Sequence, residues 1–458
     1  GAIDNPTTGN ANGGTYRNNG ELSNFDGSTA ATGATYTAGD IVGVAINVDA
    51  GELKFYKNNS LQGTVSFTAG TEVFPRGRTN GTGSETATFN FGQSGFTYTP
   101  PDGFLALCTA NLPEPSISPL YGASPQDYFN TVLYTGTGAA QSITGVGFTP
   151  DFTWMKNRSA ASGHYLGDTV RGAGYQLISN NTDAEHYQRQ NGYITSYDAD
   201  GFSMTAGSSG AVETNASGNT YAAWNWKASN ATAVSNTAGT ITSQVSANTT
   251  AGFSIVSYTG NGTAGATVGH GLSSAPEFSV TKSRGGVSYW TVRVLNTYDM
   301  LLDLNVANSS GNANHTANAS TLSLLGSYNN VSAENNIAYC FHSVAGYSKI
   351  GSYTGNGSAD GPFAYTGFRP AFVMIKRTDS TGNWQMYDTS RASTNVMTAT
   401  LAADLVSAES SFTGGYDIDF VSNGFKPRTG PSNAINASGG TYIYMAFAEN
   451  PFKYANAR

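Results

Sequence analysis

The chain has 458 residues, a length that predicts about three or four domains, each large enough to bury its own core. Only 11% of the residues are charged, the net charge is -8, and the basic residues are scattered. Nucleic-acid binding is therefore not expected, because no basic stripe is present to neutralise phosphates. No apolar run approaches the ~20 residues that span a bilayer, and no signal peptide opens the chain, so membrane insertion is not expected either.

The composition favours an all-β fold. The chain is poor in residues that propagate helices and rich in Gly, Ser, Thr, Asn and β-formers. Aromatic residues reach 12%, which argues against disorder, since disordered segments lack bulky apolar side chains. Cys108 and Cys340 fall in apolar, strand-like stretches, where a free Cys acts as a small hydrophobe. Because the first residue is Gly1 and not Met, we expect that an upstream segment was removed or lies outside this sequence.

Residues 1–112 differ from the rest of the chain. An alternating run over 40–47, an Asp/Gly turn over 48–51 and a returning run over 52–57 predict a β-hairpin. Further strand-like runs follow at 63–67, 73–75 and 87–92, and the stretch 96–104 closes the segment.

The stretches GDIVGVAINVDAGELKFYKNN, ATFNFGQ and FTYTPPDGF resemble the C-terminal part of a SPRY domain, which is an antiparallel β-sandwich. The resemblance covers residues 12–107, and the hairpin, the order of the strands and the closing segment all agree. The N-terminal strands of such a domain are absent, and half a sandwich would expose an apolar face to water. The resemblance therefore implies that upstream residues or a neighbouring subunit complete the sandwich.

The domain boundaries follow from composition and repetition. After the SPRY-like sandwich over 1–112 we predict a Pro-rich linker over 113–125, because prolines fix an extended path. Three related β-sandwich (jelly-roll-like) blocks, numbered 1 to 3, are predicted over 126–229, 251–345 and 346–458. A partly ordered connector over 230–250 separates the first two blocks, whereas blocks 2 and 3 have almost no spacer and are expected to pack as a rigid tandem.

The three blocks repeat one order of sequence signals. Each block opens on a Tyr-Thr-Gly motif, which begins at Tyr134, Tyr258 and Tyr353. A Gly-apolar step and a Pro/Phe pair follow, and then a short strand that ends in Lys156, Lys282 or Lys376. Each block closes on an aromatic strand, predicted over 221–227, 337–342 and 442–447. Such repetition indicates an array of modules, and we expect each block to bury its own aromatic centre.

The SPRY-like module combined with YTGNG…GFxPxF…K repeats resembles structural proteins of tailed bacteriophages, particularly phages of marine cyanobacteria. The resemblance covers nearly the whole chain. It implies a virion component on the particle surface, such as a tail fibre, a spike or a capsid appendage, that forms a homo-oligomer and binds other virion proteins. Contact with a host would be non-catalytic recognition of surface polysaccharide, strengthened by avidity. Two alternatives stay open: a tail-spike depolymerase that cleaves host polysaccharide, and a bacterial adhesin or extracellular sheath protein.

No constellation of residues predicts a catalytic centre, a metal site or a cofactor. The five histidines never occur at paired ligand spacing, and no CxxC accompanies them. Asp417 and Asp419 would project from one face of a predicted strand, and such a pair could cleave a glycoside. The solvent face of an edge strand explains them more simply. No Gly-x-Ser-x-Gly motif lies between a strand and a helix, and the Gly-rich stretches lack the lysine and helix that bind phosphate.

Recurring aromatics and variable loops are the remaining candidates for function. Trp290 and Trp384 occupy equivalent positions, with Tyr165 as the counterpart in block 1, and core anchoring explains them more simply than sugar stacking. The recurring lysines are expected to close a strand or to pair with a carboxylate of the same block. Loops that differ between blocks are better binding candidates. The ligand-binding residues predicted on such loops are Arg76, Arg78, His186 and Arg189.

Overall fold

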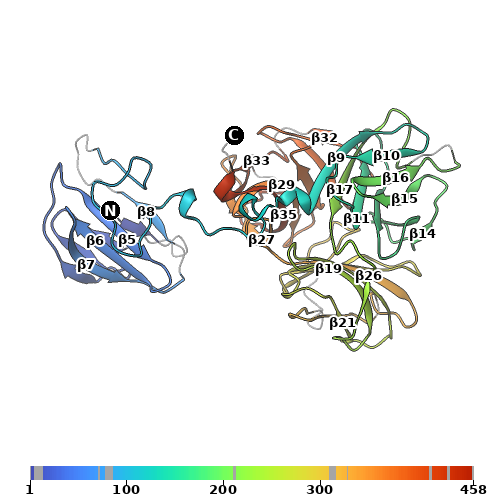
Figure 1. Cartoon of the computed structure of the whole chain (residues 1–458), viewed down its shortest axis with the longest axis horizontal. Helices are drawn as coiled ribbons and strands as arrows, with labels where there is room; N and C mark the ends of the chain where they lie inside the picture. The colour runs from blue at the N-terminus through green and yellow to red at the C-terminus, as the bar shows by residue number, and fades with distance from the viewer. Residues whose placement is uncertain are drawn as a thin grey trace. The chain divides into compact units, whose positions relative to one another are not determined.

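A computed structural model describes residues 2–4, 14–70, 73–77, 86–209, 213–308, 316–326, 328–411, 415–430 and 434–455. It confirms the predicted all-β fold, whose strand ladders are antiparallel (Figure 1). The described helical elements are four short 3-10 turns: η1 Thr109–Asn111, η2 Pro119–Tyr121, η3 Pro125–Asp127 and η4 Phe452–Tyr454. Within the described ranges, no helix is long and apolar enough to cross a membrane. The chain divides into two compact units, Gly1–Pro113 and Glu114–Arg458.

The N-terminal unit contains two sheets. The larger sheet has the order β4-β3-β2-β1-β8, with the bounds β1 Ala2–Asp4, β2 Gly14–Tyr16, β3 Glu21–Ser23, β4 Thr29–Thr32 and β8 Phe74–Arg76. The smaller sheet consists of β5 Val42–Asn47, β6 Glu52–Lys57 and β7 Ser60–Ser66. The antiparallel pairing of β5 with β6 confirms the predicted hairpin. The core of the N-terminal unit is small and consists of Tyr16, Leu22, Leu53, Phe55 and Val65.

The closing part of this unit differs from the prediction. The strand-like run over 87–92 forms no strand, and the rings of Phe89 and Phe91 are exposed and stack on each other at 6.1 Å. Cys108 is likewise exposed and lies outside any strand, whereas Cys340 is buried in β26; both are free thiols. The apolar pattern of residues 87–108 therefore did not predict burial.

Each block of the C-terminal unit contains one large and one small sheet. In block 1 the large sheet has the order β14-β13-β12-β11-β17-β9, with β9 Phe129–Thr135, β11 Phe152–Asn157, β12 His164–Asp168, β13 Tyr175–Ile178, β14 His186–Tyr187 and β17 Thr220–Trp226. Its small sheet has the order β10-β16-β15, with β10 Gln141–Thr144, β15 Tyr193–Asp198 and β16 Gly201–Thr205.

Blocks 2 and 3 repeat this plan. The large sheet of block 2 is β18-β19-β20-β26-β22-β23-β24, with β18 Val234–Asn236, β19 Ser243–Asn248, β20 Phe253–Thr259, β22 Phe278–Ser283, β23 Thr291–Val294, β24 Tyr298–Leu301 and β26 Asn335–Phe341. Its small sheet pairs β21 Thr267–Gly269 with β25 Thr321–Ser323.

The large sheet of block 3 is β27-β35-β29-β30-β31-β32, with β27 Ser348–Thr354, β29 Phe368–Arg377, β30 Gln385–Asp388, β31 Ala399–Ala402, β32 Ser410–Ser411 and β35 Thr441–Pro451. Its small sheet is β28-β34-β33, with β28 Ala364–Tyr365, β33 Ile418–Val421 and β34 Gly424–Pro427.

The connector and the linker both contribute to this unit. Residues of the predicted connector form β18 and β19, which extend the large sheet of block 2. Ile117, within the predicted linker, is fully buried in the core of the C-terminal unit. The residue bounds of the three blocks themselves stay a prediction.

The central strands of the large sheets are buried on both faces. Along β17, Tyr221 and Ala223 face the small sheet of block 1, whereas Ala222, Trp224 and Trp226 face the opposite way. Along β35, Tyr442, Tyr444 and Ala446 face the small sheet of block 3, and Ile443, Met445 and Phe447 face the opposite way. This strict period of two is that of a strand between two apolar layers.

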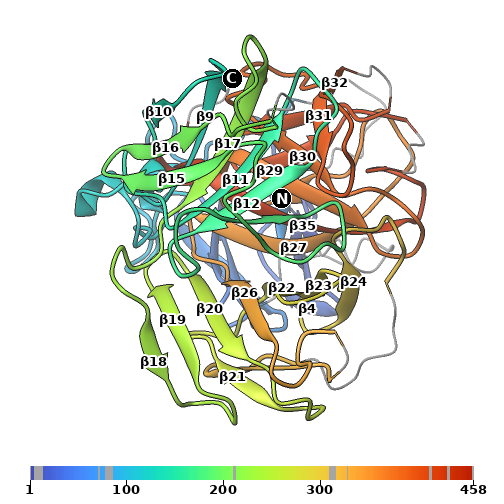
Figure 2. The same cartoon turned by 90° about the vertical axis from the view of Figure 1, so that its right-hand side faces the viewer.

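The outward faces of the three large sheets meet in one shared core, around which the blocks are arranged (Figure 2). Trp226 of block 1 is 1% exposed, and its ring lies 5.2 Å from Phe152, 6.2 Å from Phe341 of block 2 and 5.6 Å from Phe447 of block 3. The expectation that each block buries its own aromatic centre is thus corrected. Each block keeps a smaller core between its two sheets, but its tryptophans lie in the core common to all three.

The Tyr-Thr-Gly motif has the same structural cause in every block. A Cβ on Gly136, Gly260 or Gly355 would lie 2.2 to 2.3 Å from a backbone carbonyl oxygen, so only glycine fits. A buried asparagine anchors the turn: Asn215, Asn330 and Asn436 each accept a hydrogen bond from a backbone N–H of the motif, at 2.9 Å. The repeated sequence signal therefore marks a tight, internally bonded turn.

Replacement of Asn330 by alanine is expected to lower the free energy of unfolding by about 2–3 kcal/mol. The side chain accepts from Asn261 N–H and donates to the Asn261 Oδ1 and to the Thr263 carbonyl at 2.7 Å, and its loss leaves buried polar groups unpaired. Urea denaturation followed by fluorescence measures the change. Asn450→Ala, at an exposed position, is the control and should stay within about 0.5 kcal/mol of the wild type. Equal stability of the two variants would contradict the anchoring role.

Candidate functional site

Ionisable side chains gather where one block contacts the next. Three loops, residues 179–185, 302–308 and 403–409, follow the edge of a large sheet and lie against the neighbouring block; we call them the interface loops. Their backbone bonds repeat in all three contacts, as Ser162 N–H to the Val406 carbonyl, Ser288 N–H to Thr182 and Gly382 N–H to Asn305, at 2.8 to 2.9 Å. Block 1 thus holds the loop of block 3, block 2 that of block 1, and block 3 that of block 2, which closes a ring with approximate threefold symmetry.

The three recurring lysines hold the interface loops. Each is fully buried at the end of its strand. Lys156 Nζ donates to the carbonyls of Ser162 and Val406 at 2.9 and 3.1 Å, Lys376 Nζ to Asn305 and Val306 at 3.2 and 2.8 Å, and Lys282 Nζ to Thr182 at 3.2 Å. The prediction that they close strands or pair within their own block is corrected in one respect, because each bonds the loop of a neighbouring block.

Burial sets unusual protonation equilibria at these contacts. It lowers the pKa of Lys156, Lys282 and Lys376 to about 8 each. It also raises the pKa of Asp303 and Asp404, on the interface loops, to about 6. One oxygen of each carboxyl accepts the backbone N–H of Trp290 or Trp384 at 3.0 Å. In block 1 Asn180 takes this place and accepts from His164 N–H at 2.8 Å.

The aspartates predict a measurable pH dependence. Their folded pKa of about 6 exceeds the unfolded value of 3.8, so their stabilising contribution is complete below pH 3.8 and is lost as pH rises through about 6. The double variant Asp303→Asn/Asp404→Asn, which copies Asn180, is expected to be more stable than the wild type by about 5 kcal/mol at pH 7.5, because the pKa of each carboxyl rises from 3.8 to about 6, and by only about 1 kcal/mol at pH 4. Urea denaturation at four pH values between 4 and 7.5 measures this difference. A variant that is less stable at pH 7.5 would show that the carboxylates stabilise the ring.

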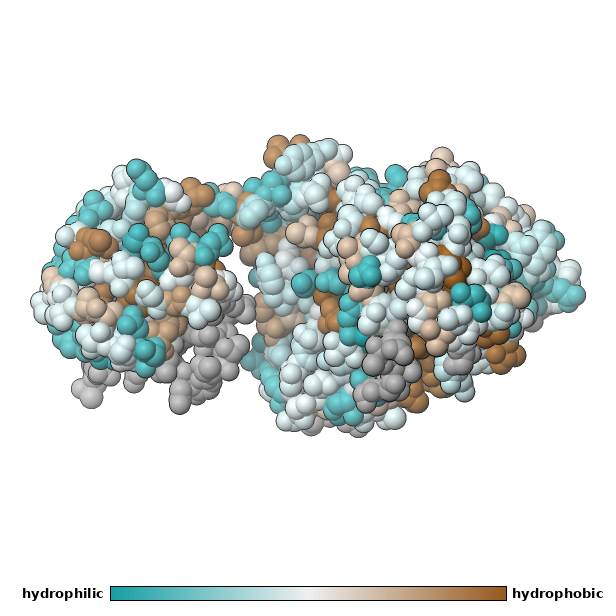
Figure 3. Space-filling model, turned by 90° about the horizontal axis from the view of Figure 1, so that it is seen from below, coloured by the Kyte–Doolittle hydropathy of each residue, from teal (hydrophilic) through white to brown (hydrophobic). Residues whose placement is uncertain are grey.

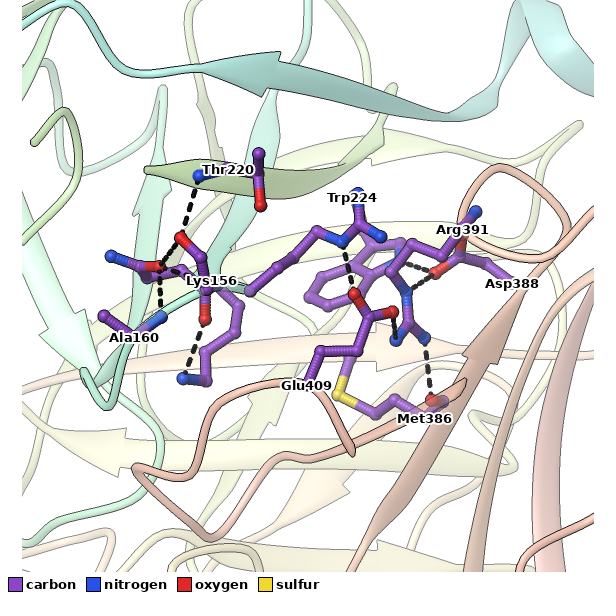
Figure 4. A network of polar contacts seen from close by, with 11 residues as sticks. Lys156, Ala160, Thr220, Trp224, Met386, Asp388, Arg391 and Glu409 are labelled. Carbon is purple, nitrogen blue, oxygen red and sulfur yellow. Dashed lines mark hydrogen bonds and ion pairs between the residues drawn. The ribbon is translucent and has the colours of Figure 1, made fainter. Parts of the chain in front are cut away.

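The contact of block 1 with block 3 is a network of buried ion pairs (Figure 4). Arg391 Nε donates to Asp388 Oδ2 at 2.5 Å, both side chains being fully buried, and Trp224 Nε1 of block 1 donates to the same carboxylate at 3.0 Å. Glu409 lies between Arg391 and Arg158 of block 1, at 3.2 and 2.6 Å. Two carboxylates of block 3 are thereby bound by block 1: Asp388 by the Trp224 indole and Glu409 by the Arg158 guanidinium.

The contact of block 2 with block 1 has the same design. Arg171 pairs with Asp168, and Tyr339 of block 2 donates its hydroxyl to Asp168 at 2.8 Å. Glu185 bridges Arg171 and Arg284 of block 2 at 3.0 and 2.7 Å.

The contact of block 3 with block 2 lacks these charges. The position of the buried aspartate is occupied here by Val294, and the position of its Tyr or Trp partner by Met445. The glutamate of the other contacts is replaced by Asn308, and the arginine that it pairs with is replaced by Thr378. The backbone bond is nevertheless kept, since Asn308 N–H donates to the Thr378 carbonyl at 2.9 Å. Among the described residues, two contacts of the ring therefore have these ion pairs, whereas the third is held by hydrogen bonds and apolar packing.

This three-block unit corresponds to a single family. The family model described as Domain of unknown function (DUF7483) matches residues 124–451, which is most of the chain and all three blocks. The chain belongs to this family. A SPRY domain model matches residues 4–94, which include the strands β2, β3 and β4 before the hairpin. The expectation that only the C-terminal part of such a domain is present, without its N-terminal strands, is therefore corrected, whereas the resemblance to a SPRY domain is confirmed. No curated protein and no solved structure matches the chain.

Two of the predicted ligand-binding residues, His186 and Arg189, belong to the DUF7483 region, and the other two, Arg76 and Arg78, belong to the SPRY domain. In the DUF7483 region, His186 lies in β14 and not in a loop; Arg189 pairs with Glu213 at 3.3 Å and lies 5.7 Å from the centre of the Tyr165 ring. In the SPRY domain, Arg76 ends β8, where its backbone faces Ala2, and Arg78 lies outside the described residues.

The other sequence candidates are placed as follows. Asp419 lies on β33 and pairs with Arg428 at 3.2 Å, and Asp417 lies just before this strand. Among the described His, Cys, Asp and Glu side chains no group could hold a metal ion. Trp290 and Trp384 are fully buried core residues of the DUF7483 unit, as predicted. Their counterpart in block 1 is His164 and not Tyr165, because Asn180 bonds the His164 N–H as Asp303 and Asp404 bond those of the tryptophans.

Proposed function

We propose that the chain is a non-enzymatic structural protein of a tailed-bacteriophage virion, a tail fibre, spike or capsid-surface appendage that displays modules for attachment to a host surface. The observation that carries the proposal is the use of its buried charges. The fully buried ion pairs Arg171–Asp168 and Arg391–Asp388 hold blocks together and line neither of the two pockets found in the described part of the chain. Perturbed ionisable groups gather at catalytic centres or in structural ion-pair networks, and this arrangement is of the second kind.

The surface agrees with a role in display. On the face drawn in Figure 3, polar and weakly polar residues cover most of the surface and apolar residues form small, separate patches. The resemblance of the YTGNG…GFxPxF…K repeats to phage structural proteins supplies the virion setting. Assembly with other virion proteins and into a homo-oligomer at the virion surface is part of the proposal, because repetition and symmetry multiply weak contacts with a host polysaccharide.

The SPRY domain gives the proposal a site of assembly. Val44 of β5 lies opposite Phe55 in the register of the small sheet, yet Val44 is 46% exposed whereas Phe55 is fully buried. Val42 and Ile46 of the same row pack against the core, so Val44 is an exposed apolar position within that row, and we propose that a neighbouring subunit covers it. Sedimentation velocity of the purified chain measures assembly, and a monomer at every concentration would contradict this part of the proposal.

Electron microscopy of virions tests the virion role directly. Gold-labelled antibodies against the purified chain are expected to decorate the tail or capsid surface of phage particles that package the coding sequence. Pre-immune serum is the control. Mass spectrometry of the same particles should find the chain among the virion proteins, and its absence from intact particles would overturn the proposal.

The depolymerase alternative makes the opposite prediction in solution. The purified chain is expected to release no reducing ends from the surface polysaccharide of the host cells over a long incubation. Asp419, the candidate carboxylate on β33, is already engaged by Arg428. Release that disappears in Asp417→Asn/Asp419→Asn would establish the enzymatic function and overturn the non-enzymatic one.

A further inference from the structure

Block 3 contains a pocket of about 320 Å³ that lies apart from the contacts described above. It is lined by Arg369, Ser393, Thr394 and Asn395. Arg369 belongs to β29, and the other three residues belong to the loop that joins β30 to β31. The pocket lies near the lower end of the ~300–1,000 Å³ range of small-molecule sites.

The charge of the pocket is balanced. Arg369 is 4% exposed, and its guanidinium pairs with the carboxylate of Glu449 on β35. Because this pair brings a positive and a negative charge together, the pocket has no net charge with which to select an anion or a cation. It offers a ligand hydrogen-bonding groups beside a lining surface that is partly apolar.

The lining loop presents hydroxyl groups on a fixed frame. Asn395 Nδ2 donates to the Phe420 carbonyl at 2.8 Å and its Oδ1 accepts from Phe420 N–H at 3.0 Å, which ties the loop to β33. Ser390 Oγ donates to the Thr131 carbonyl of block 1 at 3.2 Å. Ser393 and Thr394, between these two ties, are exposed, and within the described part of the chain their hydroxyls bond no other group. Two hydroxyls are therefore available to a ligand on a loop anchored on both sides.

The pocket is a property of block 3 and not of the repeat. In block 1 the arginine position of the Gly-Phe-x-Pro step holds Thr149. The segment between Arg171 and β13 of block 1 is also shorter, residues 172–174, than the segment 392–398 between Arg391 and β31. Since blocks that share a frame acquire function in the loops that differ, this is the place in the ring where a specific ligand is expected.

We propose that this pocket binds a neutral saccharide, whose hydroxyls bond the Ser393 and Thr394 hydroxyls and the Arg369–Glu449 pair. A sugar fits because its hydroxyls can bond these polar groups, its apolar ring face can lie on the apolar part of the lining, and the charges of the pair cancel, whereas an acidic sugar would need an uncompensated cation. The inference deepens the proposed function and rests on it for the source of the sugar, a host-surface polysaccharide.

Titration calorimetry and saturation-transfer NMR with purified chain test the site. The probes are the neutral oligosaccharides laminarihexaose and isomaltohexaose, with hexagalacturonate as the acidic comparison. At least one neutral probe is expected to bind in the millimolar range, and Ser393→Ala/Thr394→Ala should weaken it about tenfold, the effect of losing two hydrogen bonds. Ser352→Ala/Thr354→Ala is the matched control, since it removes one serine and one threonine hydroxyl from exposed positions of β27 in block 3, and it should leave binding unchanged.

The other results would overturn the proposal. They are binding of hexagalacturonate alone, binding that both double variants leave unchanged, and no binding of any probe at millimolar concentration. Because these measurements use the purified chain, they are independent of the virion. A chain that is found on virions but binds no neutral sugar would refute the pocket alone, and a chain that binds sugar through Ser393 and Thr394 but is absent from virions would refute the virion role alone.

Discussion

Replacement of Trp226 by alanine is expected to destabilise all three blocks together, by about 3–5 kcal/mol. The indole is 1% exposed and packs against Phe152 of block 1, Phe341 of block 2 and Phe447 of block 3. Truncation of a fully buried Trp removes these contacts and leaves a cavity that the surrounding sheets cannot fill. Because the cavity would lie in the shared core, its effect should not be confined to the block that carries the mutation.

Hydrogen exchange of the native protein measures how the effect is distributed. In Trp226→Ala we expect faster exchange in β17, β26 and β35, one strand from each block. Phe202→Ala is the control, since Phe202 is fully buried in the smaller core of block 1 alone. That variant should accelerate exchange first in β10, β15 and β16. Faster exchange confined to block 1 in Trp226→Ala would mean that the blocks are independently stable modules.

The repeated pattern predicted the elements of this unit but not how they meet. The lysine-ending strands and the closing aromatic strands are present as β11, β22, β29 and as β17, β26, β35. Strands buried on both faces read as near-continuous apolar runs, and the runs YAAWNW and YIYMAFA of β17 and β35 are of this kind. This signal could have indicated a second apolar layer outside each sandwich. It could not have indicated which block packs against that face, because contacts such as that of Lys156 with Val406 join residues 250 positions apart. No local pattern in a single sequence predicts such a contact.

The position of His164 shows that a sequence comparison of the blocks must identify which face of the strand each residue occupies. The aromatic pattern predicts Tyr165 as the counterpart of Trp290 and Trp384, but Tyr165 belongs to the core between the two sheets of block 1. His164, one position earlier, faces the neighbouring block, and burial lowers its pKa well below its usual range. Along a strand, a shift of one residue moves a side chain to the opposite face of the sheet. The aromatic residue type alone therefore predicted the wrong residue of block 1 as the counterpart of the two tryptophans. The pocket in block 3 is still harder to predict from the sequence, because it combines an arginine and a longer loop that block 1 lacks.

Removal of the Arg171 guanidinium is expected to lower the free energy of unfolding by about 3–5 kcal/mol. In Arg171→Met the fully buried carboxylate of Asp168 loses its cation, while Tyr339 remains bonded to it, and an uncompensated buried charge is strongly destabilising. Glu185 keeps Arg284 and should contribute little to the loss. Urea denaturation at pH 7 measures the change, with Arg428→Met as the control at a half-exposed ion pair, where less than about 1 kcal/mol is expected.

The contact between blocks 3 and 2, where apolar residues replace this ion pair, shows how the loss of stability should be repaired. There Val294 stands in the position of Asp168, and Met445 stands in the position of Tyr339. The triple variant Asp168→Val/Arg171→Met/Tyr339→Phe removes all three polar partners at once and is expected to recover to within about 1 kcal/mol of the wild type, since a buried ion pair can be replaced by packed apolar groups. If the triple variant is as unstable as Arg171→Met, the ion pairs determine how blocks 1 and 2 fit together, and packing alone does not hold that contact.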